Sequence, residues 1–309
     1  MLRGALKTGW MAFVFITGPV HAQKWSFAVI SDPRGMRCSY RKALREIRDM
    51  TVQSTPEVPA AEFVVVNGDI GGIRSHLRIF RHIFRNHPVM KSIYPVIGNH
   101  ESPWQRNIII QKILPVLDSI TVIDPQAAHY CLDWKNARFL IFNQYTIEAP
   151  RGCLGSKAIR WATERIEEAR ADTWLHHVFI FIHEPAFPRY RHLDDSFNQC
   201  PQERNSFWNV MAGNRDLVRA VFCGHTHTCS RIRIADPESA DANDPTLFPL
   251  QHDGVYQIDS GASGQGKMIT VIRIAINDST VSGYAVEAEK SRGSKFKLID
   301  EWILAAESN

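Results

Sequence analysis

Short apolar runs that each end in a polar residue recur along the first third of the chain and predict strands. Three of them, at 25–31, 63–66 and 93–97, alternate with segments whose apolar residues recur at helical spacing, around 39–50 and 77–84. A strand–helix–strand–helix–strand order implies parallel strands joined by right-handed crossovers. The pattern therefore predicts an α/β fold, with Ser39 as the candidate N-cap of its first helix.

The rest of the chain has a different pattern. Short strands at 121–123, 130–132 and 139–143 are closely connected and predict antiparallel pairing, followed by a helix that Ser156 would cap and a buried strand at 177–182. A polar and aromatic stretch at 186–202 precedes a helix at 207–218. A loop of this length in a compact domain is usually functional or disordered. Further strands are expected at 230–234, 254–258, 269–274, 281–286 and 296–304, and we expect one domain over 23–309.

Composition and charge narrow the function classes. The chain has 309 residues, 44% of them hydrophobic, which is enough for a sizeable core. Its formal net charge of +4 is small, and lysine and arginine are scattered, so we expect no nucleic-acid partner.

The start of the chain is typical of a signal peptide over residues 1–22. Arg3 and Lys7 precede an apolar stretch at 10–20 that is too short to span a bilayer, and Ala22 is a small residue at the expected cleavage position. We therefore expect a periplasmic or secreted protein without a stable membrane anchor, and leave its oligomeric state open.

The six cysteines lie after that segment, so disulfides are permitted, but the sequence does not choose among the pairings. Cys223 and Cys229 flank a His-Thr-His segment. For them a buried thiol or a disulfide is favoured over metal ligation.

Five predicted strands end in residues able to bind a metal: Asp32, Asp69, Asn99 with His100, His183, and His225 with His227. Strand ends are where an open α/β sheet places its ligands. Carboxylate, amide oxygen and imidazole together suit divalent ions such as Mn, Fe or Zn. A bridging carboxylate lets such a set hold two ions roughly 3.5–4 Å apart, a pair that clamps a phosphoryl oxygen and activates water.

Each of these residues, taken alone, has a plainer interpretation. Asp32 and Asp69 could be turn residues, His100 a surface residue, and His183 a satisfied core histidine. Their order along the chain favours the metal interpretation. We expect His176 and His177 at the surface, and we treat five further histidines as structural: His82, His87, His129, His192 and His252. Arg189, Tyr190 and Arg191 could either line a pocket or belong to a solvated loop.

In this order, Asp-x-Arg (32–34), Gly-Asp (68–69), Gly-Asn-His-Glu (98–101), the strand-terminal His183 and Gly-His-Thr-His (224–227) resemble the calcineurin-like metallophosphoesterase superfamily. The resemblance covers residues 25–286. It implies a four-layer α/β/β/α sandwich of two mixed β-sheets. It also implies that Asp69 bridges two metals, that Asn99, His183 and His225 complete one site, and that Asp32 and His227 hold the other. His100 would act as the acid for the leaving group and Glu101 would orient it.

Arg34 departs from the family pattern, because a metal-ligating histidine usually stands at this position. Arginine stays charged and has no lone pair to offer. At ~4 Å from a divalent ion and an effective dielectric constant of ~20, the repulsion would be about 8 kcal/mol. Arg34 should therefore point away, bind substrate phosphate or weaken one metal site, and its planar fork favours the second of these.

The sequence thus predicts an exported hydrolase of small phosphate esters with two divalent ions. The alternative is a catalytically impaired protein on the same fold that binds a phosphate ligand, because Arg34 replaces a metal ligand. The acid His100, for which a binding protein has no need, favours the enzyme.

Overall fold

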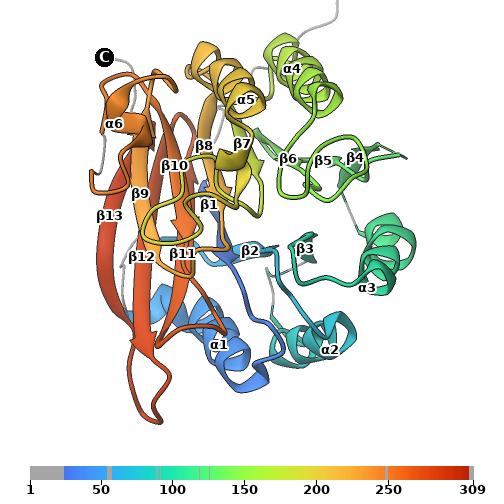
Figure 1. Cartoon of the computed structure of the whole chain (residues 1–309). Coiled ribbons are helices and arrows are strands. Elements are labelled where there is room, and N and C mark those ends of the chain that lie inside the picture. The colour runs from blue at the N-terminus through green and yellow to red at the C-terminus, as the bar shows by residue number, and fades with distance from the viewer. Residues whose placement is uncertain are drawn as a thin grey trace, which may run out of the picture.

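Two β-sheets packed face to face make the centre of the structure, and helices cover both outer sides (Figure 1). This computed structural model describes residues 24–53, 58–87, 90, 92–117, 119–124, 126–247 and 250–305. The layers follow the order helix, sheet, sheet, helix. The four-layer sandwich of two mixed sheets that the resemblance implied is confirmed, whereas the expected signal peptide lies outside the described residues.

The first sheet has six strands, in the order β13 (Lys297–Ala305), β12 (Thr280–Glu289), β11 (Met268–Asn277), β1 (Lys24–Ile30), β2 (Ala61–Asn67) and β3 (Ser92–Val96). Strands β1, β2 and β3 are parallel, as predicted, and β11 to β13 continue the sheet antiparallel. Ile30 pairs with Val66, and Asn67 pairs with Val96. This register brings the loops after the three parallel strands to one edge of the sheet.

The second sheet has seven strands, in the order β4 (Ile120–Ile123), β5 (Tyr130–Trp134), β6 (Ala137–Ile141), β7 (His177–Phe181), β8 (Val218–Cys223), β10 (Val255–Ser260) and β9 (Cys229–Ile234). The pairs β4–β5 and β5–β6 are antiparallel, as expected for these short strands, and β6, β7, β8 and β10 are parallel. Phe181 pairs with Phe222 and Cys223 with Asp259, so these strands also end together.

Helices α1 (Arg37–Gln53) and α2 (Ile73–Ile83) pack on the first sheet, and α4 (Ser156–Ala171) and α5 (Pro201–Gly213) pack on the second (Figure 1). The sequence did not predict α3 (Pro103–Ile108), which continues into a π-helix (Ile109–Ile113) and a 3-10 turn (Leu114–Val116), nor the short α6 (Ala240–Asn243). No helix among the described residues combines the length and the apolar character needed to cross a membrane.

Aromatic side chains fill the space between the sheets. Phe27 on β1 stacks on Phe63 with ring centroids 5.4 Å apart, and it meets Phe139 and Phe179 of the other sheet edge-on at 5.0 and 5.1 Å. Such pairs contribute about 0.5–1.5 kcal/mol each beyond the area that they bury. The sheets are therefore held in one arrangement, which fixes the strand ends of both relative to each other.

Two predicted helix caps are wrong. Helix α1 begins at Arg37, so Ser39 lies in its first turn, and α4 begins at Ser156 itself, with Gly155 at the cap. The helix predicted at 207–218 begins earlier and ends at Gly213, because Val218 already starts β8.

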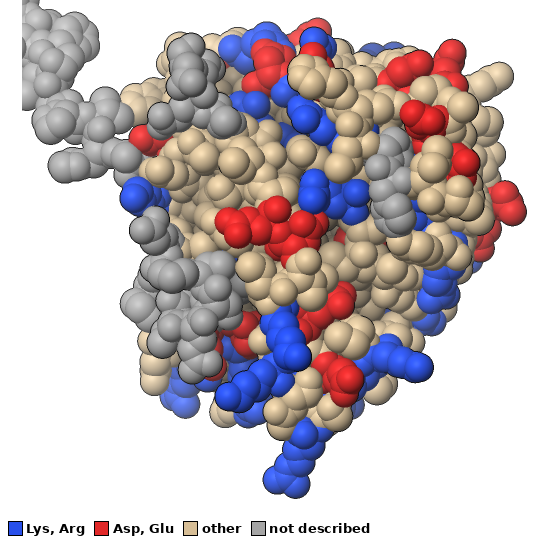
Figure 2. Space-filling model, turned by 90° about the vertical axis from the view of Figure 1, so that its left-hand side faces the viewer, with Lys and Arg blue, Asp and Glu red and all other residues tan. Residues whose placement is uncertain are grey.

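Charged side chains are mixed on the face that Figure 2 shows, where small groups of Lys and Arg alternate with groups of Asp and Glu outside the grey atoms. A face of this kind presents no broad area of one sign.

Candidate metal centre

The predicted metal ligands lie at the neighbouring ends of β1, β2, β3, β7 and β8. Several of them hold a left-handed backbone that side chains rarely adopt, with φ of 50° at Asp32, 51° at Asp69, 70° at His225 and 62° at His227. Such a conformation costs of order 1–3 kcal/mol per residue and persists only where the surroundings fix it. Backbone hydrogen bonds do so here, from Asp32 to Gly68 (3.2 Å) and from Gly224 to His183 (2.9 Å).

Two glycines allow the turns to approach one another closely. A Cβ on Gly68, which has φ of 88°, would collide with the ring of His183, and a Cβ on Gly98 would collide with Asp69. Both motifs therefore require glycine for space, and Gly68 is also required for its left-handed backbone.

The first set of donors is Asp32, Asp69 and His227, each of which offers one atom within 4.8 Å of the others. Nε2 of His227 lies 3.2 Å from Oδ1 of Asp32, an oxygen that is buried and has no hydrogen-bond partner among the described residues. Burial raises the pKa of Asp32, but His227 and His183 outweigh it and lower the pKa to about 2. The carboxylate is therefore charged and turned toward its neighbours.

The second set is Asp69, Asn99, His183 and His225. Nε2 of His183 lies 3.4 Å from Oδ1 of Asp69 and 3.2 Å from Oδ1 of Asn99. If the Asn99 amide turns over, its nitrogen donates to both Asp69 oxygens, at 3.0 and 3.1 Å, so the amide can present either atom to this space. The ring of His225 lies beside that of His183, with centroids 5.3 Å apart. The six predicted ligands therefore lie near one another, and Asp69 contacts members of both sets.

The two histidines of the second set differ in the pKa of their rings. Nδ1 of His183 lies 2.9 Å from the carbonyl oxygen of Asn67, a contact in which Nδ1–H donates and turns Nε2 toward Asp69. Burial lowers the pKa of His183, but Asp69 and Asp32 outweigh it and raise the pKa to about 9. In His225, burial, followed by His183 and His192, lowers the pKa to about 2, so this ring stays neutral.

The donors fit a divalent cation. Asp32 and Asp69 are almost wholly buried, at 0% and 1% exposure, and two carboxylates in such surroundings require positive charge beside them. Oδ1 of Asp32 and Nε2 of His225 are buried atoms without a hydrogen-bond partner among the described residues, and both belong to ligand types that Mn, Fe and Zn accept.

Glu101 supports the site in a way that differs from the expectation. Its buried carboxylate accepts hydrogen bonds from the backbone N–H groups of Gly98 (2.7 Å), Gly71 (3.0 Å) and Asp69 (3.1 Å), rather than orienting the His100 ring. It therefore positions the loop of Asp69 and the turn that carries Asn99.

Arg34 points into the site, which excludes the first of the three alternatives for this residue, that it points away. Its Nη2 lies 2.9 Å from Nδ1 of His100, and its Nε lies 3.8 Å from Oδ2 of Asp69. The His100 side chain is 48% exposed, and its Nε2 lies 3.9 Å from the same Asp69 oxygen. Burial lowers the pKa of His100, and Arg34 lowers it further against the opposing effect of Asp69.

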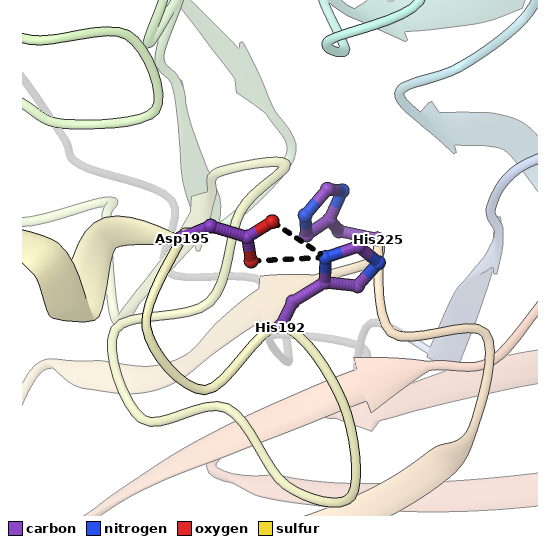
Figure 3. A group of neighbouring side chains, drawn as sticks. All are labelled: His192, Asp195 and His225. Atoms are coloured by element: carbon purple, nitrogen blue, oxygen red, sulfur yellow. Dashed lines mark hydrogen bonds and ion pairs between the residues drawn. The ribbon is translucent and has the colours of Figure 1, made fainter.

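Residues 186–202 form a loop over the second set, and the sequence offered Arg191 as a possible pocket residue but not His192 or Asp195. The ring of His192, which we had treated as structural, lies over His225 with centroids 3.9 Å apart, and Asp195 contacts Nδ1 of His192 at 2.9 and 3.1 Å (Figure 3). Arg191 bridges Nδ1 of His227 (2.9 Å) and Nε2 of His192 (3.0 Å). Only the length of the loop signalled this role, because none of these residues ends a strand.

The cysteines do not act as metal ligands in this arrangement. Cys153 and Cys200 form a disulfide that ties the end of this loop to the segment after β6. Cys223 and Cys229 are free thiols, and burial raises the pKa of both, which favours the neutral thiol over a thiolate ligand.

A further support is Asp259, which the sequence placed only in a small-residue loop after a strand. Its buried carboxylate accepts hydrogen bonds from the Thr226 hydroxyl and the Gly261 N–H (3.1 Å). Asp259 therefore braces the turn between His225 and His227.

Comparison with known proteins agrees with this geometry. The sequence matches the family model of the calcineurin-like phosphoesterases over residues 26–229, and no curated protein matches it. A purple acid phosphatase, PPD1 from yellow lupin (Lupinus luteus) seeds, is 12% identical with a TM-score of 0.63, over 92% of this chain and 54% of the lupin chain. GAP50, the anchor in the inner membrane complex of Plasmodium, is 11% identical with a TM-score of 0.61, over 92% of this chain and 90% of that one.

At these identities the two likenesses show the fold alone, and this chain spans about half the length of the lupin protein, 54%. The family model, in contrast, covers most of the sequence and both sets of donors, and it ends at Cys229, where β9 begins. The chain belongs to the calcineurin-like phosphoesterase family.

Proposed function

We propose that this protein is an exported, metal-dependent hydrolase of small phosphate esters. The observation that carries the proposal is the convergence of six donor residues from five strand ends around the buried carboxylate of Asp69. Family membership supports a phosphoesterase. Divalent ions of the Mn, Fe or Zn type, once bound here, would polarise the phosphoryl group and supply an activated water.

The donor side chains would hold the metal ions in two groups. Asp69 faces both sets of donors, so it is the residue that would bridge two ions, with Asn99, His183 and His225 on one side and Asp32 and His227 on the other. His225 stays neutral, as a ligand must, while a cation would have to displace the proton that Asp69 and Asp32 hold on His183.

His100 is the proton donor of the proposal. Arg34 donates to Nδ1 of His100, so the ring proton sits on Nε2, which faces the Asp69 side of the site. Half of this side chain is exposed, which leaves room for a substrate beside it. To act as an acid, His100 would first take a second proton on Nδ1 when Arg34 turns from it to the substrate phosphate. The imidazolium would then pass its Nε2 proton to the oxygen of the leaving group and remain a neutral ring, a contribution of typically 10²–10⁴-fold in rate.

Two guanidinium groups would bind the anionic substrate. Arg34 lies beside Asp69 and His100, and Arg191 lies beside His227, so they flank the donors from two loops. Arginine matches the geometry of phosphate oxygens and can bind two of them at once. We assign Arg34 to substrate binding on this ground.

Export is part of the proposal. The basic and apolar start of the sequence supports it, and so does the Cys153–Cys200 disulfide, because such bonds persist mainly in oxidising compartments. Fractionation of cells that express the full chain, followed by detection of the protein outside the cytoplasm with residues 1–22 removed, would test this.

A second candidate function is phosphate-ligand binding without turnover. The contact of Arg34 with Asp69 favours it, because a cation at this position opposes a metal ion. GAP50, which has this fold, is described as an anchor, so the fold alone does not decide between the two functions.

Hydrolysis of para-nitrophenyl phosphate and of its bis-ester, with Mn, Fe or Zn supplied, separates the candidates. The enzyme should release nitrophenol from at least one ester, and His100→Ala should abolish most of this, whereas His252→Ala, a change at a side chain that is 91% exposed, should not. Folded protein that binds phosphate but turns over neither ester with any of the three metals would contradict the hydrolase.

A further inference from the structure

The backbone of Arg34 is fixed between two loops. Its N–H donates to the carbonyl of Asp69 at 2.8 Å, and its φ is 40°. A Cβ on Gly71 would lie 2.8 Å from N of Gly35 and 3.1 Å from C of Arg34, and on the other side Gly264 packs directly against Pro33. The segment is therefore held on both sides, and the Arg34 side chain cannot leave the site by a movement of its backbone.

The guanidinium of Arg34 lies beside Asp69, the carboxylate that both sets share, on the side of Oδ2 and not of Oδ1, which faces His183 of the second set. Its Nε is 3.8 Å from Oδ2 of Asp69, which is 1% exposed, while the Arg34 side chain itself is 27% exposed. Solvent and salt screen a contact with a buried carboxylate only partly. Because arginine stays charged and offers no lone pair, it occupies the surroundings of Asp69 as a permanent cation.

Arg191 adds a second cation to the same set. Its Nη1 lies 2.9 Å from Nδ1 of His227, a contact that requires a lone pair on Nδ1. A His227 ring that binds a metal through Nε2 carries its proton on Nδ1, so Arg191 would have to turn away first. Both arginine contacts therefore oppose a cation at the set formed by Asp32, Asp69 and His227.

In the second set, no arginine that the structure describes has to be displaced from a donor atom of His225. This set offers four donors, Asp69, Asn99, His183 and His225, and the neighbouring Arg151 contacts the backbone carbonyl of Asn99 rather than a donor atom. The Nε2 atom of His225 has no hydrogen-bond partner among the described residues and needs no displacement of an arginine.

We propose that Arg34 is a resident cation of the first set, so that the protein binds one divalent ion tightly at Asp69, Asn99, His183 and His225 and a second ion much more weakly. This inference rests on the proposed metal-dependent function and specifies its metal content. The expected difference between the two affinities is at least about 10-fold, since one unit of like charge within ~4 Å of an ion easily supplies it.

Titration of the chelator-treated full chain with Mn²⁺, followed by calorimetry and by electron paramagnetic resonance, tests the proposal without any activity measurement. The wild type should bind one tight equivalent with the signal of an isolated ion. Arg34→Gln should strengthen the second equivalent about 10-fold by removing the charge. Arg34→His, which adds a donor and tolerates the left-handed backbone, should give two tight, magnetically coupled equivalents.

Two control variants complete the design. Arg34→Lys keeps the charge and should leave the second equivalent weak. Arg74→Gln removes the same charge from an exposed residue of α2 that stacks on Trp104 at 5.5 Å, and it should bind Mn²⁺ as the wild type does.

Two tight and equal equivalents in the wild type would overturn the inference and leave the hydrolase intact. The same holds if folded Arg34→Gln and Arg34→His, judged by circular dichroism, bind the second ion as weakly as the wild type does. Failure of the wild type to bind any Mn²⁺, Fe²⁺ or Zn²⁺ would overturn the metal-dependent function itself and the inference with it. Because the wild-type measurement decides alone, a variant that does not fold leaves the test valid.

Discussion

Strand β7 carries a buried histidine near each end, and the two have opposite surroundings. At its start, His177 uses both ring nitrogens: Nε2 donates to the carbonyl of Asp278 at 2.7 Å, and Nδ1 accepts from Nε of Arg219 at 2.9 Å. Just past its end, His183 uses Nδ1 for the carbonyl of Asn67 and turns Nε2 toward Asp69 and Asn99.

The pKa values of the two rings reflect this difference. Burial lowers the pKa of His177 to about 4, whereas in His183 burial acts in the same direction but Asp69 and Asp32 outweigh it and raise the pKa to about 9. Both side chains are 0% exposed. Burial therefore does not separate a structural histidine from a candidate ligand, and the partner of the second ring nitrogen does.

The sharpest test of this comparison changes one histidine at a time. His183→Ala should remove the metal of the second set and lower kcat/KM for a chromogenic phosphate ester by at least about 10³-fold, because a bound metal contributes several kcal/mol of transition-state stabilisation. His177→Ala should leave kcat/KM within a few-fold but lower the free energy of unfolding by about 2–4 kcal/mol, through the cavity and the unpaired Arg219 and Asp278 groups.

Steady-state kinetics, metal analysis and urea unfolding measure these effects. The comparison breaks down if His177→Ala loses metal and activity as His183→Ala does, or if His183→Ala retains both.

A third histidine at the same edge should affect rate without affecting metal. His100→Ala should lower kcat by about 10²–10⁴-fold, because it removes the proton donor, while the metal content stays that of the wild type. Single-turnover kinetics on an ester with a poor leaving group would show the largest loss. Loss of metal from this variant would place His100 among the ligands instead of beside them.

A change at Glu101 tests whether a residue that positions the ligand loops affects activity and metal affinity as the ligands themselves do. Glu101→Gln replaces one acceptor oxygen by a donor that faces backbone N–H groups of Gly98, Gly71 and Asp69, so it should lower activity or metal affinity by about 10–100-fold. Glu167→Gln, at an exposed position of α4, is the matched control and should change neither. If Glu101→Gln binds metal and turns over substrate as the wild type does, the Glu101 carboxylate contributes only to the stability of the fold.

The smallest expected effect is on the pH dependence of stability. The folded pKa of His177, about 4, lies below its usual 6.5, so the unfolded chain takes up a proton first as the pH falls. Stability is therefore lost as the pH falls below 6.5 toward 4, by about 2 kcal/mol between pH 7 and pH 5. Urea unfolding at both pH values, in the wild type and in His177→Asn, measures this contribution, which should be absent from the variant.

The sequence predicted the strands and the six donor residues because both depend on local patterns. An apolar run of about the length of a strand predicts a buried strand, and a polar residue at its end falls at the sheet edge. For the same reason the sequence misjudged His177, which we expected at the surface. Nothing in its neighbours along the chain shows that Arg219 and Asp278 cover it.

The residues of the 186–202 loop were harder to predict. His192 and Asp195 reach His225 only because the loop folds over the site, and the disulfide of Cys153 with Cys200 fixes the end of that loop. Loop conformation depends on contacts between distant segments, for which periodicity and spacing carry no signal.

By itself, then, the order of apolar runs and strand-end residues determined the fold class and pointed to six candidate donors at one edge of the sheets. Only the tertiary structure decided that Arg34 turns toward Asp69, that Glu101 binds backbone amides and that Arg191 and His192 join the site. The physical reason is that side-chain direction depends on through-space charge and packing. These involve segments that lie far apart in the sequence and become neighbours only after the two sheets have packed.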